Sequence, residues 1–364
     1  MKQNELIKRT TLLMCIFAAI TVAAICYYSS HKIVVVAESE QGQTINVTKS
    51  GSSSDDEGEK LLFDEKPGQS SYLCIPLEDS IKAGNIITEN HYMDDQLWIG
   101  LKGASSSFYD TEKLGGQHSE IKDAYRTVEG DRLWLKFDLN GAYEYKSVYE
   151  NGNLYVEFVP PHEKYSRIIV VDAAYGKVSG GTEDVSDGRS DITLGVVTDL
   201  KKLLDDTDIR VYYTRMSQMS PGEEKRLNLA NEVKADMLIR IEVSDDEDSK
   251  IYGTRTIYNS NYFIPGFGSV ELADMLERQT VTAISGKAVG LQASTDDDYV
   301  ISGARVPAAS IRLGYMSNAQ EQRLLGRDDY QQKAADGIYK AIMDCYKLLD
   351  ENSEETETGT TDVR

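Results

Sequence analysis

The chain has 364 residues, of which 40% are hydrophobic and 27% are charged, and its formal net charge at pH 7 is −21. This length is enough for about two domains, each with a hydrophobic core of its own. The net charge combines +3 over residues 1–32 with −24 over the rest of the chain. A surface so strongly acidic repels nucleic acid and anionic lipid, which argues against both as partners.

An uncharged, apolar run covers residues 10–28 (TTLLMCIFAAITVAAICYY). Its length is close to the ~20 residues that a helix needs to cross a bilayer. Three basic residues, Lys2, Lys8 and Arg9, precede the run. Because a positive flank stays in the cytoplasm, we expect residues 1–9 on the cytoplasmic side and everything after the run outside. The sequence therefore predicts a single-pass signal anchor in the cell membrane, with extracytoplasmic domains.

Two alternatives to this anchor are a cleaved signal peptide and a lipoprotein signal ending at Cys26. Ile25 is too large for a lipoprotein cleavage site, and no small-x-small site follows the run. The run is also longer than the apolar region of a usual signal peptide. These observations favour an uncleaved anchor but leave cleavage open.

The chain contains two segments without apolar periodicity. Residues 37–70 read as an acidic, Ser-rich linker, and residues 351–364 read as an acidic, disordered tail. Outside the apolar run the only cysteines are Cys74 and Cys345, which do not make a disulfide framework. Whether they pair is open at this stage, and we favour two free thiols.

Residues 71–160 show the pattern of a small β-domain. Short strand-like segments (LWIGLKG, DRLWLKFDL, YEYKSVY and NLYVEFVPP) are separated by turn signals, including Asn-Gly pairs at Asn140 and Asn151. In the second segment, apolar residues alternate with Trp134 and Lys136. This two-residue period predicts an N-terminal β-sandwich domain.

Residues 166–349 alternate between strand and helix patterns. We expect strands at 167–172, 209–214, 237–243, 252–259 and 308–313, and helices at 191–205, 221–234, 270–284 and 328–349. Ser220, Pro221 and Glu223 have the spacing of a capping box at the start of the second helix. The alternation predicts an α/β domain with a parallel or mixed sheet flanked by helices.

Several landmarks in this half of the chain occur together and in order. They are VDAAYGK after the first strand, Thr214 with Arg215, Arg226 with Ala230 and Asn231, Ala235 with Asp236, and PAASIRLGYMSN before the last helices. In this combination the domain resembles the catalytic domain of the zinc-dependent N-acetylmuramoyl-L-alanine amidases. The segment 131–160 weakly resembles the AMIN-type β-domains that precede some of these amidases and bind the cell wall. A spacer domain without a ligand explains that segment equally well.

The resemblance implies a zinc site in which two imidazoles and a carboxylate hold the metal and a glutamate acts as base. The positions that match these residues here are Tyr175, Arg189, Glu242 and Arg312, with Asp172 nearby. An arginine has no lone pair to give a metal, and a protonated tyrosine is a poor ligand. The four histidines of the chain lie outside residues 166–349, at His31, His91, His118 and His162.

Two interpretations of the altered pocket follow. In the first, Arg189 and Arg312 fill the metal space and pair with Glu242 and Asp172. In the second, the two guanidiniums bind a carboxylate of a peptidoglycan stem peptide. The sequence favours the first.

From these changes we leave catalysis open and favour a protein that is not an enzyme. The favoured function is a membrane-anchored, catalytically inactive amidase-like protein that binds peptidoglycan or an envelope protein in cell-wall remodelling, with no cofactor predicted. The alternative is an active amidase of peptidoglycan catabolism that uses zinc. A third is an interaction protein in which residues 166–349 are a passive spacer.

Overall fold

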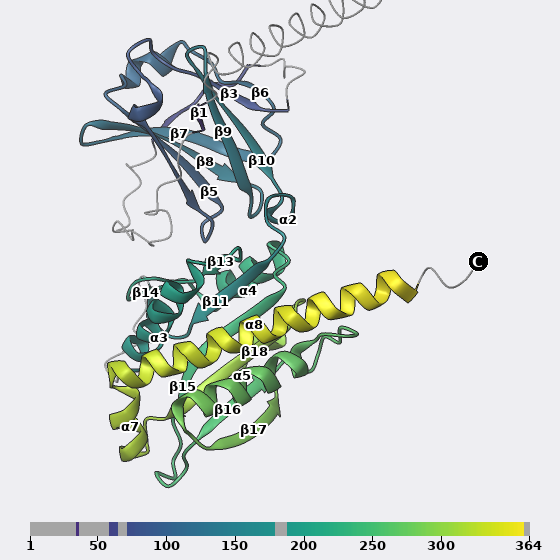
Figure 1. The fold of residues 1–364 in the computed structure, drawn as a ribbon. Coiled ribbons are helices and arrows are strands. Elements are labelled where there is room, and N and C mark those ends of the chain that lie inside the picture. The colour runs from purple at the N-terminus through teal and green to yellow at the C-terminus, as the bar shows by residue number, and fades with distance from the viewer. Residues whose placement is uncertain (1–33, 36–57, 65–70, 179–187, 360–364) are drawn as a thin grey trace, which may run out of the picture.

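The computed structural model describes residues 34–35, 58–64, 71–178 and 188–359. They form two domains, a β-domain and an α/β domain, joined by the short helix α2 (Pro161–Lys164) (Figure 1).

The β-domain consists of two five-stranded sheets. One has the order β1-β9-β10-β3-β6 and the other β2-β7-β8-β5-β4. Their strands are β1 (Val34–Val35), β2 (Glu59–Lys60), β3 (Leu73–Pro76), β4 (Ile86–His91), β5 (Gln96–Lys102), β6 (Gly115–Gly116), β7 (Ile121–Glu129), β8 (Arg132–Leu139), β9 (Glu144–Glu150) and β10 (Asn153–Val159). Two 3-10 helices, η2 (Ala83–Asn85) and η3 (Ser106–Asp110), lie between strands. Apolar residues of both sheets share one core, as the alternating pattern of the sequence predicts for a sandwich.

The α/β domain is built on a six-stranded sheet with the order β13-β11-β15-β18-β16-β17. β11, β13, β15 and β18 are mutually parallel, whereas β16 runs antiparallel to β18, so the sheet is mixed. The strands are β11 (Ile168–Ala173), β13 (Arg210–Tyr213), β15 (Met237–Ser244), β16 (Thr254–Tyr258), β17 (Ala288–Ala293) and β18 (Ala308–Tyr315). β12 (Lys177–Val178) and β14 (Met219–Ser220) form a separate two-stranded pair.

Helices cover both faces of this sheet (Figure 1). α3 (Arg189–Leu204), α5 (Ser269–Ile284) and α8 (Asp328–Gly359) share the larger core with one face. α4 (Glu223–Glu232) and α6 (Tyr299–Ser302) pack on the other, and α7 (Ala319–Leu325) precedes α8. The prediction of an α/β fold with a mixed sheet flanked by helices is therefore confirmed. β11 is buried at every position, as its continuous apolar run requires.

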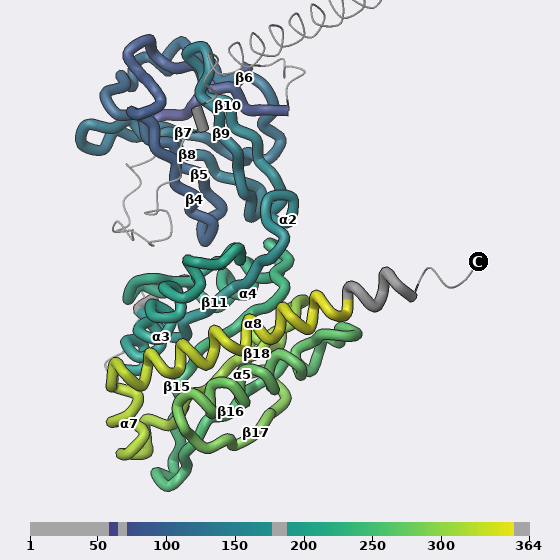
Figure 2. Tube along the Cα trace, in the orientation of Figure 1, coloured from purple at the N-terminus to yellow at the C-terminus, as the bar shows by residue number. Residues whose placement is uncertain are grey.

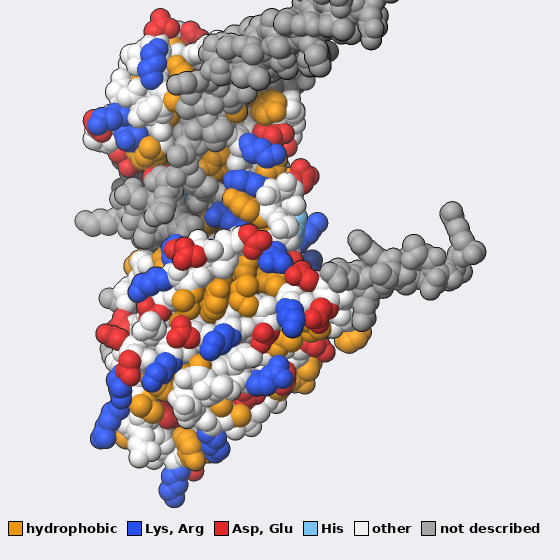
Figure 3. Space-filling view, in the orientation of Figure 1, with side chains coloured by type: hydrophobic (Ala, Val, Ile, Leu, Met, Phe, Trp, Pro, Cys, Tyr) orange, Lys and Arg blue, Asp and Glu red, His pale blue; other side chains and the backbone are white. Residues whose placement is uncertain are grey.

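The β4–β5 hairpin points toward the α/β domain (Figure 2), and its side chains contact that domain. Tyr92, in that hairpin, belongs to the core cluster formed by β11, β13, α4 and α6. Its ring meets the ring of Tyr212 edge-on, with 4.9 Å between centroids. On the face of the molecule that Figure 3 shows, Lys and Arg side chains are interspersed with Asp and Glu side chains.

Some local features differ from the sequence prediction. α4 is capped by Gly222, without a side-chain cap, so the expected capping box at Ser220 does not form. The Ser220 hydroxyl instead accepts a hydrogen bond from the guanidinium of Arg226. Leu61 lies in the β-domain core, which extends that domain into the segment expected to be linker. The backbone of α8 stays helical to Gly359, within the segment expected to be a disordered tail.

Other expectations concern the cysteines and the membrane. Cys74 and Cys345 are both free thiols, as favoured. Within the described parts of the chain, no helix is long and apolar enough to cross a membrane. The apolar run at residues 10–28 lies outside the described residues, so the anchor stays a prediction.

Candidate functional site

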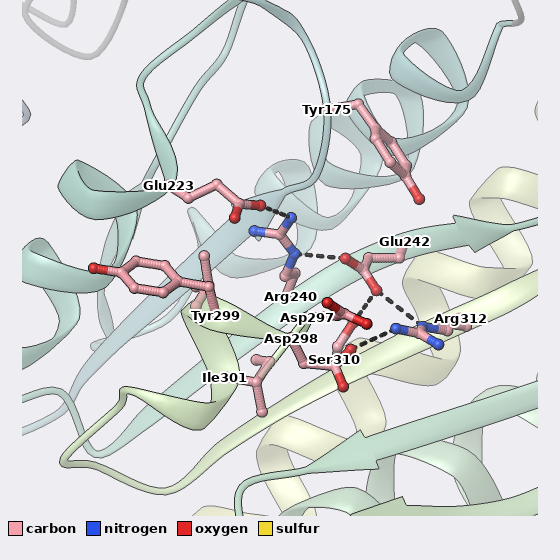
Figure 4. A pocket seen from close by; sticks show the side chains of 11 residues that line it. Tyr175, Glu223, Arg240, Glu242, Asp297, Asp298, Tyr299, Ile301, Ser310 and Arg312 are labelled. Carbon is pink, nitrogen blue, oxygen red and sulfur yellow. Dashed lines mark hydrogen bonds and ion pairs between the residues drawn. The ribbon is translucent and has the colours of Figure 1, made fainter. Parts of the chain in front are cut away.

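A cavity of about 200 Å³ opens beside β15 and β18, the central strands of the α/β sheet (Figure 4). Sites in α/β folds form at the carboxyl ends of parallel strands, and β15 and β18 are parallel. The residues that line the cavity are Tyr175, Glu223, Arg240, Glu242, Asp297, Asp298, Tyr299, Val300, Ile301, Ser310 and Arg312. Its lining therefore carries four carboxylates and two guanidiniums.

Arg240 and Glu242 stand two residues apart on β15, so strand alternation places both side chains on one face. Arg240 donates from Nε to Glu242 Oε1 over 2.6 Å. Its two terminal nitrogens reach other elements: Nη1 donates to Asp172 Oδ2 over 2.7 Å, and Nη2 to Glu223 Oε1 over 2.9 Å. One guanidinium thus joins carboxylates from β11, β15 and α4.

Arg312 lies directly opposite Glu242 in the pairing of β18 with β15. Its Nε donates to Glu242 Oε2 over 3.1 Å, and its Nη2 donates to Asp298 Oδ1 over 2.6 Å. Ser310, two residues earlier on β18, donates to the same Glu242 Oε2 over 2.8 Å. The register of the two strands shifts between Glu242 and Ser244, and such irregularities are common beside active sites.

Asp172, near the end of β11, is fully buried. Its Oδ1 accepts from the Thr214 hydroxyl over 2.5 Å and from Arg226, while its Oδ2 accepts from Arg240. Burial alone would raise the pKa of Asp172, but the Arg226 and Arg240 guanidiniums outweigh burial and hold that pKa below its ordinary value. The pKa of Glu242 is lowered in the same way, with Arg240 and Arg312 outweighing the effect of burial.

Tyr175 follows β11 with a backbone φ of 66°, a left-handed conformation that is strained for a bulky residue. Its hydroxyl donates to the carbonyl of Val243 over 2.6 Å. Burial, and then the charge of Glu242, raise the pKa of Tyr175 to about 12, so its hydroxyl is protonated at neutral pH. The Cζ of Arg189 lies 4.9 Å from the centroid of the Tyr175 ring, a cation–π contact.

Two arginines of the sequence landmarks hold the turn that carries Tyr175. Arg215 is buried and donates to the carbonyls of Ala173 and Ala174 over 2.9 Å each. Arg226 donates to the carbonyls of Ala173 and Tyr175 over 2.8 Å each. Arg215 and Arg226 therefore fix the backbone of the turn beside the pocket.

The structure places three of the four positions singled out from sequence in the pocket lining, and the fourth, Arg189, lies against the ring of Tyr175. Tyr175, Glu242 and Arg312 line the pocket, and Arg312 pairs with Glu242 as expected. The expected pairing of Asp172 with Arg189 or Arg312 is replaced by ion pairs to Arg226 of α4 and Arg240 of β15, because Arg240 lies opposite Asp172 in the pairing of the two strands. The sequence does not predict four further residues of the pocket lining: Arg240, Asp297, Asp298 and Glu223.

The pocket residues do not fit a zinc ion. Zinc sites use three or four N, S or O ligands with free lone pairs. Within the ranges that the structure describes, no group of three His, Cys, Asp or Glu side chains is placed to hold a metal. The Glu242 oxygens both accept from donors of the protein, and the Tyr175 hydroxyl is itself a donor. These residues therefore support no catalytic step through a metal ion.

The fold and the pocket define a helix-flanked α/β domain with a polar site beside its central strands. Residues 169–344 match the model of the N-acetylmuramoyl-L-alanine amidase family. This match covers nearly all of the α/β domain, so the comparison supports the amidase-family resemblance that the sequence landmarks predict.

Three known proteins illustrate the similarity. An uncharacterized Bacillus subtilis protein, YqiI, is 28% identical over 180 residues, which is 50% of this chain and 85% of that protein. The germination-specific N-acetylmuramoyl-L-alanine amidase of Bacillus subtilis is 26% identical over 193 residues, covering 49% of this chain and 78% of the amidase. A crystal structure of an N-acetylmuramoyl-L-alanine amidase from Clostridium difficile 630 matches with 23% identity and a TM-score of 0.45, over 50% of this chain and 97% of that one.

These comparisons correct one sequence-based expectation. We favoured a protein that is not an enzyme because the matching positions carry Tyr175, Arg189, Glu242 and Arg312. The matched family is one of hydrolases, and relatives with assigned activities are amidases. The class of protein that the comparisons indicate is therefore a cell-wall hydrolase.

Proposed function

We propose that this protein acts on the peptidoglycan of the cell wall as an amidase, hydrolysing the amide bond between muramic acid and the stem peptide. The observation that carries the proposal is the family match over residues 169–344, which runs from β11 into α8 and includes both strands of the pocket. In the reaction, water adds to the amide carbonyl, the C–N bond breaks, and the departing amine takes up a proton.

The pocket supports the proposal because it offers both partners that an amide group requires. Arg312 uses Nε and Nη2 in ion pairs, which leaves Nη1 without a partner among the described residues. Asp297 is exposed, and within the described residues its carboxylate makes no ion pair. A donor and an acceptor in one cavity suit the amide N–H and C=O groups of a stem peptide.

The experiment uses the full-length protein and purified peptidoglycan, with mass spectrometry of the soluble products. We expect free stem peptides to accumulate over time. Binding of the protein to the wall without any release of peptide would overturn the proposed reaction.

Arg312→Ala tests whether the pocket carries this function. Removing the guanidinium takes away the Nη1 donor, so we expect slower release of peptide. Arg278→Ala, which removes an exposed guanidinium that is not part of the pocket lining, is the matched control. Equal release by Arg312→Ala and the wild type would place the reaction elsewhere.

We also propose that the protein is anchored in the cell membrane through residues 10–28, with both domains outside. The support is the uncharged run with its basic flank in the sequence. An epitope tag after residue 364 tests it: protease added to intact cells that lack an outer barrier should remove the tag. A tag that is protected until the membrane is broken would contradict the proposal.

The weak likeness of residues 131–160 to AMIN-type domains suggests that the β-domain adds wall binding of its own. This assignment stays a proposal. Retention of the full-length protein on peptidoglycan after Arg312→Ala would support it, and complete loss of retention would contradict it.

A further inference from the structure

A cluster of charged side chains in the α/β domain centres on the guanidinium of Arg240. Its three nitrogens donate to Glu242, Asp172 and Glu223 over 2.6, 2.7 and 2.9 Å. These carboxylates come from β15, β11 and α4, three elements that are separate in sequence. One side chain therefore connects two strands and a helix at the pocket.

Burial makes this arrangement energetically important. The side chains of Arg240, Asp172 and Glu242 are 8%, 0% and 13% exposed. A buried carboxylate without a positive partner is costly, and the cost is large for two in the same place. Arg226 also pairs with Asp172, and Arg312 also pairs with Glu242, but among these guanidiniums only that of Arg240 reaches both carboxylates.

The oxygens of these two carboxylates are all occupied. Asp172 Oδ1 accepts from Thr214 and Arg226, and Oδ2 from Arg240. Glu242 Oε1 accepts from Arg240, and Oε2 from Ser310 and Arg312. A divalent metal would have to displace these donors and then sit beside positive guanidiniums, which repel it.

We infer that Arg240 is the resident cation of this pocket, and that it holds Asp172, Glu242 and Glu223 together where a metal ion would otherwise be needed. The guanidinium is suited to this role because it is planar, permanently charged and presents donors in several directions. Arg240 has this role whether or not the pocket hydrolyses peptidoglycan.

The first test is the metal content and thermal unfolding of the full-length protein, purified without chelator. We expect far less than one zinc per chain by elemental analysis. The melting temperature should not change with EDTA or with added zinc chloride. One zinc per chain, or a melting temperature that EDTA lowers and zinc restores, would overturn the inference.

The second test removes the charge. Arg240→Met keeps an unbranched side chain but leaves the three carboxylates without their common partner, so we expect the melting temperature to fall by roughly 10 °C. Arg278→Met, in an exposed pair with Asp274, is the matched control and should change it little. An Arg240→Met protein as stable as the control would contradict the inference. If the variant does not fold, the metal analysis of the wild type still decides.

These outcomes are distinguishable from those that test the proposed function. Failure to release stem peptides would leave the role of Arg240 untouched. Stoichiometric zinc together with peptide release would support the reaction and overturn the inference.

Discussion

The carboxylate of Glu144, at the start of β9 in the β-domain, accepts a hydrogen bond from the hydroxyl of Tyr212 in the α/β sheet over 2.6 Å. The same carboxylate pairs with Arg210 over 2.8 Å and with Lys164 of α2 over 3.0 Å. Glu144 is fully buried, and its partners come from the linking helix and from the edge strand of the other domain. The two domains are therefore joined by a buried, fully paired charge.

Glu144→Ala should uncouple the domains. It leaves Arg210 and Lys164 without their buried partner, a change that typically costs about 3–5 kcal/mol. The only two tryptophans, Trp98 and Trp134, lie in the β-domain, whereas far-UV circular dichroism is dominated by the helices of the α/β domain. In urea we expect the two signals to change together in the wild type and separately in Glu144→Ala.

Glu163→Ala, which removes an exposed acid of the linking helix, is the matched control and should behave as the wild type does. Separate transitions in the wild type would show that the domains unfold independently and would contradict this account.

Tyr92→Phe tests the second contact between the domains. The Tyr92 hydroxyl donates to the carbonyl of Tyr213 over 3.0 Å and accepts from its backbone N–H over 3.1 Å. These two bonds satisfy backbone groups of the edge strand β13, which would otherwise lack partners. Leaving a buried polar group unpaired costs about 1–3 kcal/mol, so we expect that loss in the free energy of unfolding. Tyr262→Phe, at an exposed position, should lose nothing measurable.

Gly176→Ala tests the turn that carries Tyr175 into the pocket. Gly176 has a φ of 111°, and a Cβ there would lie 2.8 Å from the Cβ of Ser220. We expect destabilisation of roughly 1–3 kcal/mol and weaker binding to peptidoglycan, because the turn must shift. Gly222→Ala meets no atom within 4 Å and serves as control. Equal stability of the two variants would contradict the strain that we assign to this turn.

The stability of the protein should depend on Glu242 in acid. Its pKa is lowered in the folded state, so the unfolded state binds a proton first as the pH falls. The stability from Glu242 is therefore fully present above its ordinary pKa of 4.5 and is lost as the pH falls through the lowered value. Unfolding measured from pH 7 to pH 3 should show a smaller decline for Glu242→Gln than for the wild type. Parallel curves would contradict the lowered pKa.

Much of the fold could be predicted from the sequence because apolar periodicity reports burial directly. β11 is a continuous apolar run, and it is the buried parallel strand expected at that place. β17 was not predicted, and its residues are mostly half-buried or exposed, so its composition contains no such run. The capping box predicted at Ser220 does not form, because the Ser220 hydroxyl accepts a hydrogen bond from Arg226. This is a tertiary contact that the local sequence does not reveal.

Only some residues of the candidate site could be predicted from the sequence. Tyr175, Glu242 and Arg312 follow from matched motifs, which report positions but no contacts. Arg240 could have been found, because it stands two residues before Glu242 on the same strand face. Asp298 could not, because the loop before α6 has no periodicity, and only the folded chain brings it to Arg312.

The most direct test of the central claim is the digestion of purified peptidoglycan by the full-length protein, followed by mass spectrometry of the soluble products. If the protein is a cell-wall amidase with an Arg240-centred pocket, free stem peptides appear with time, and EDTA does not slow their release. An intact wall after prolonged incubation with the folded, wall-bound protein would contradict the claim.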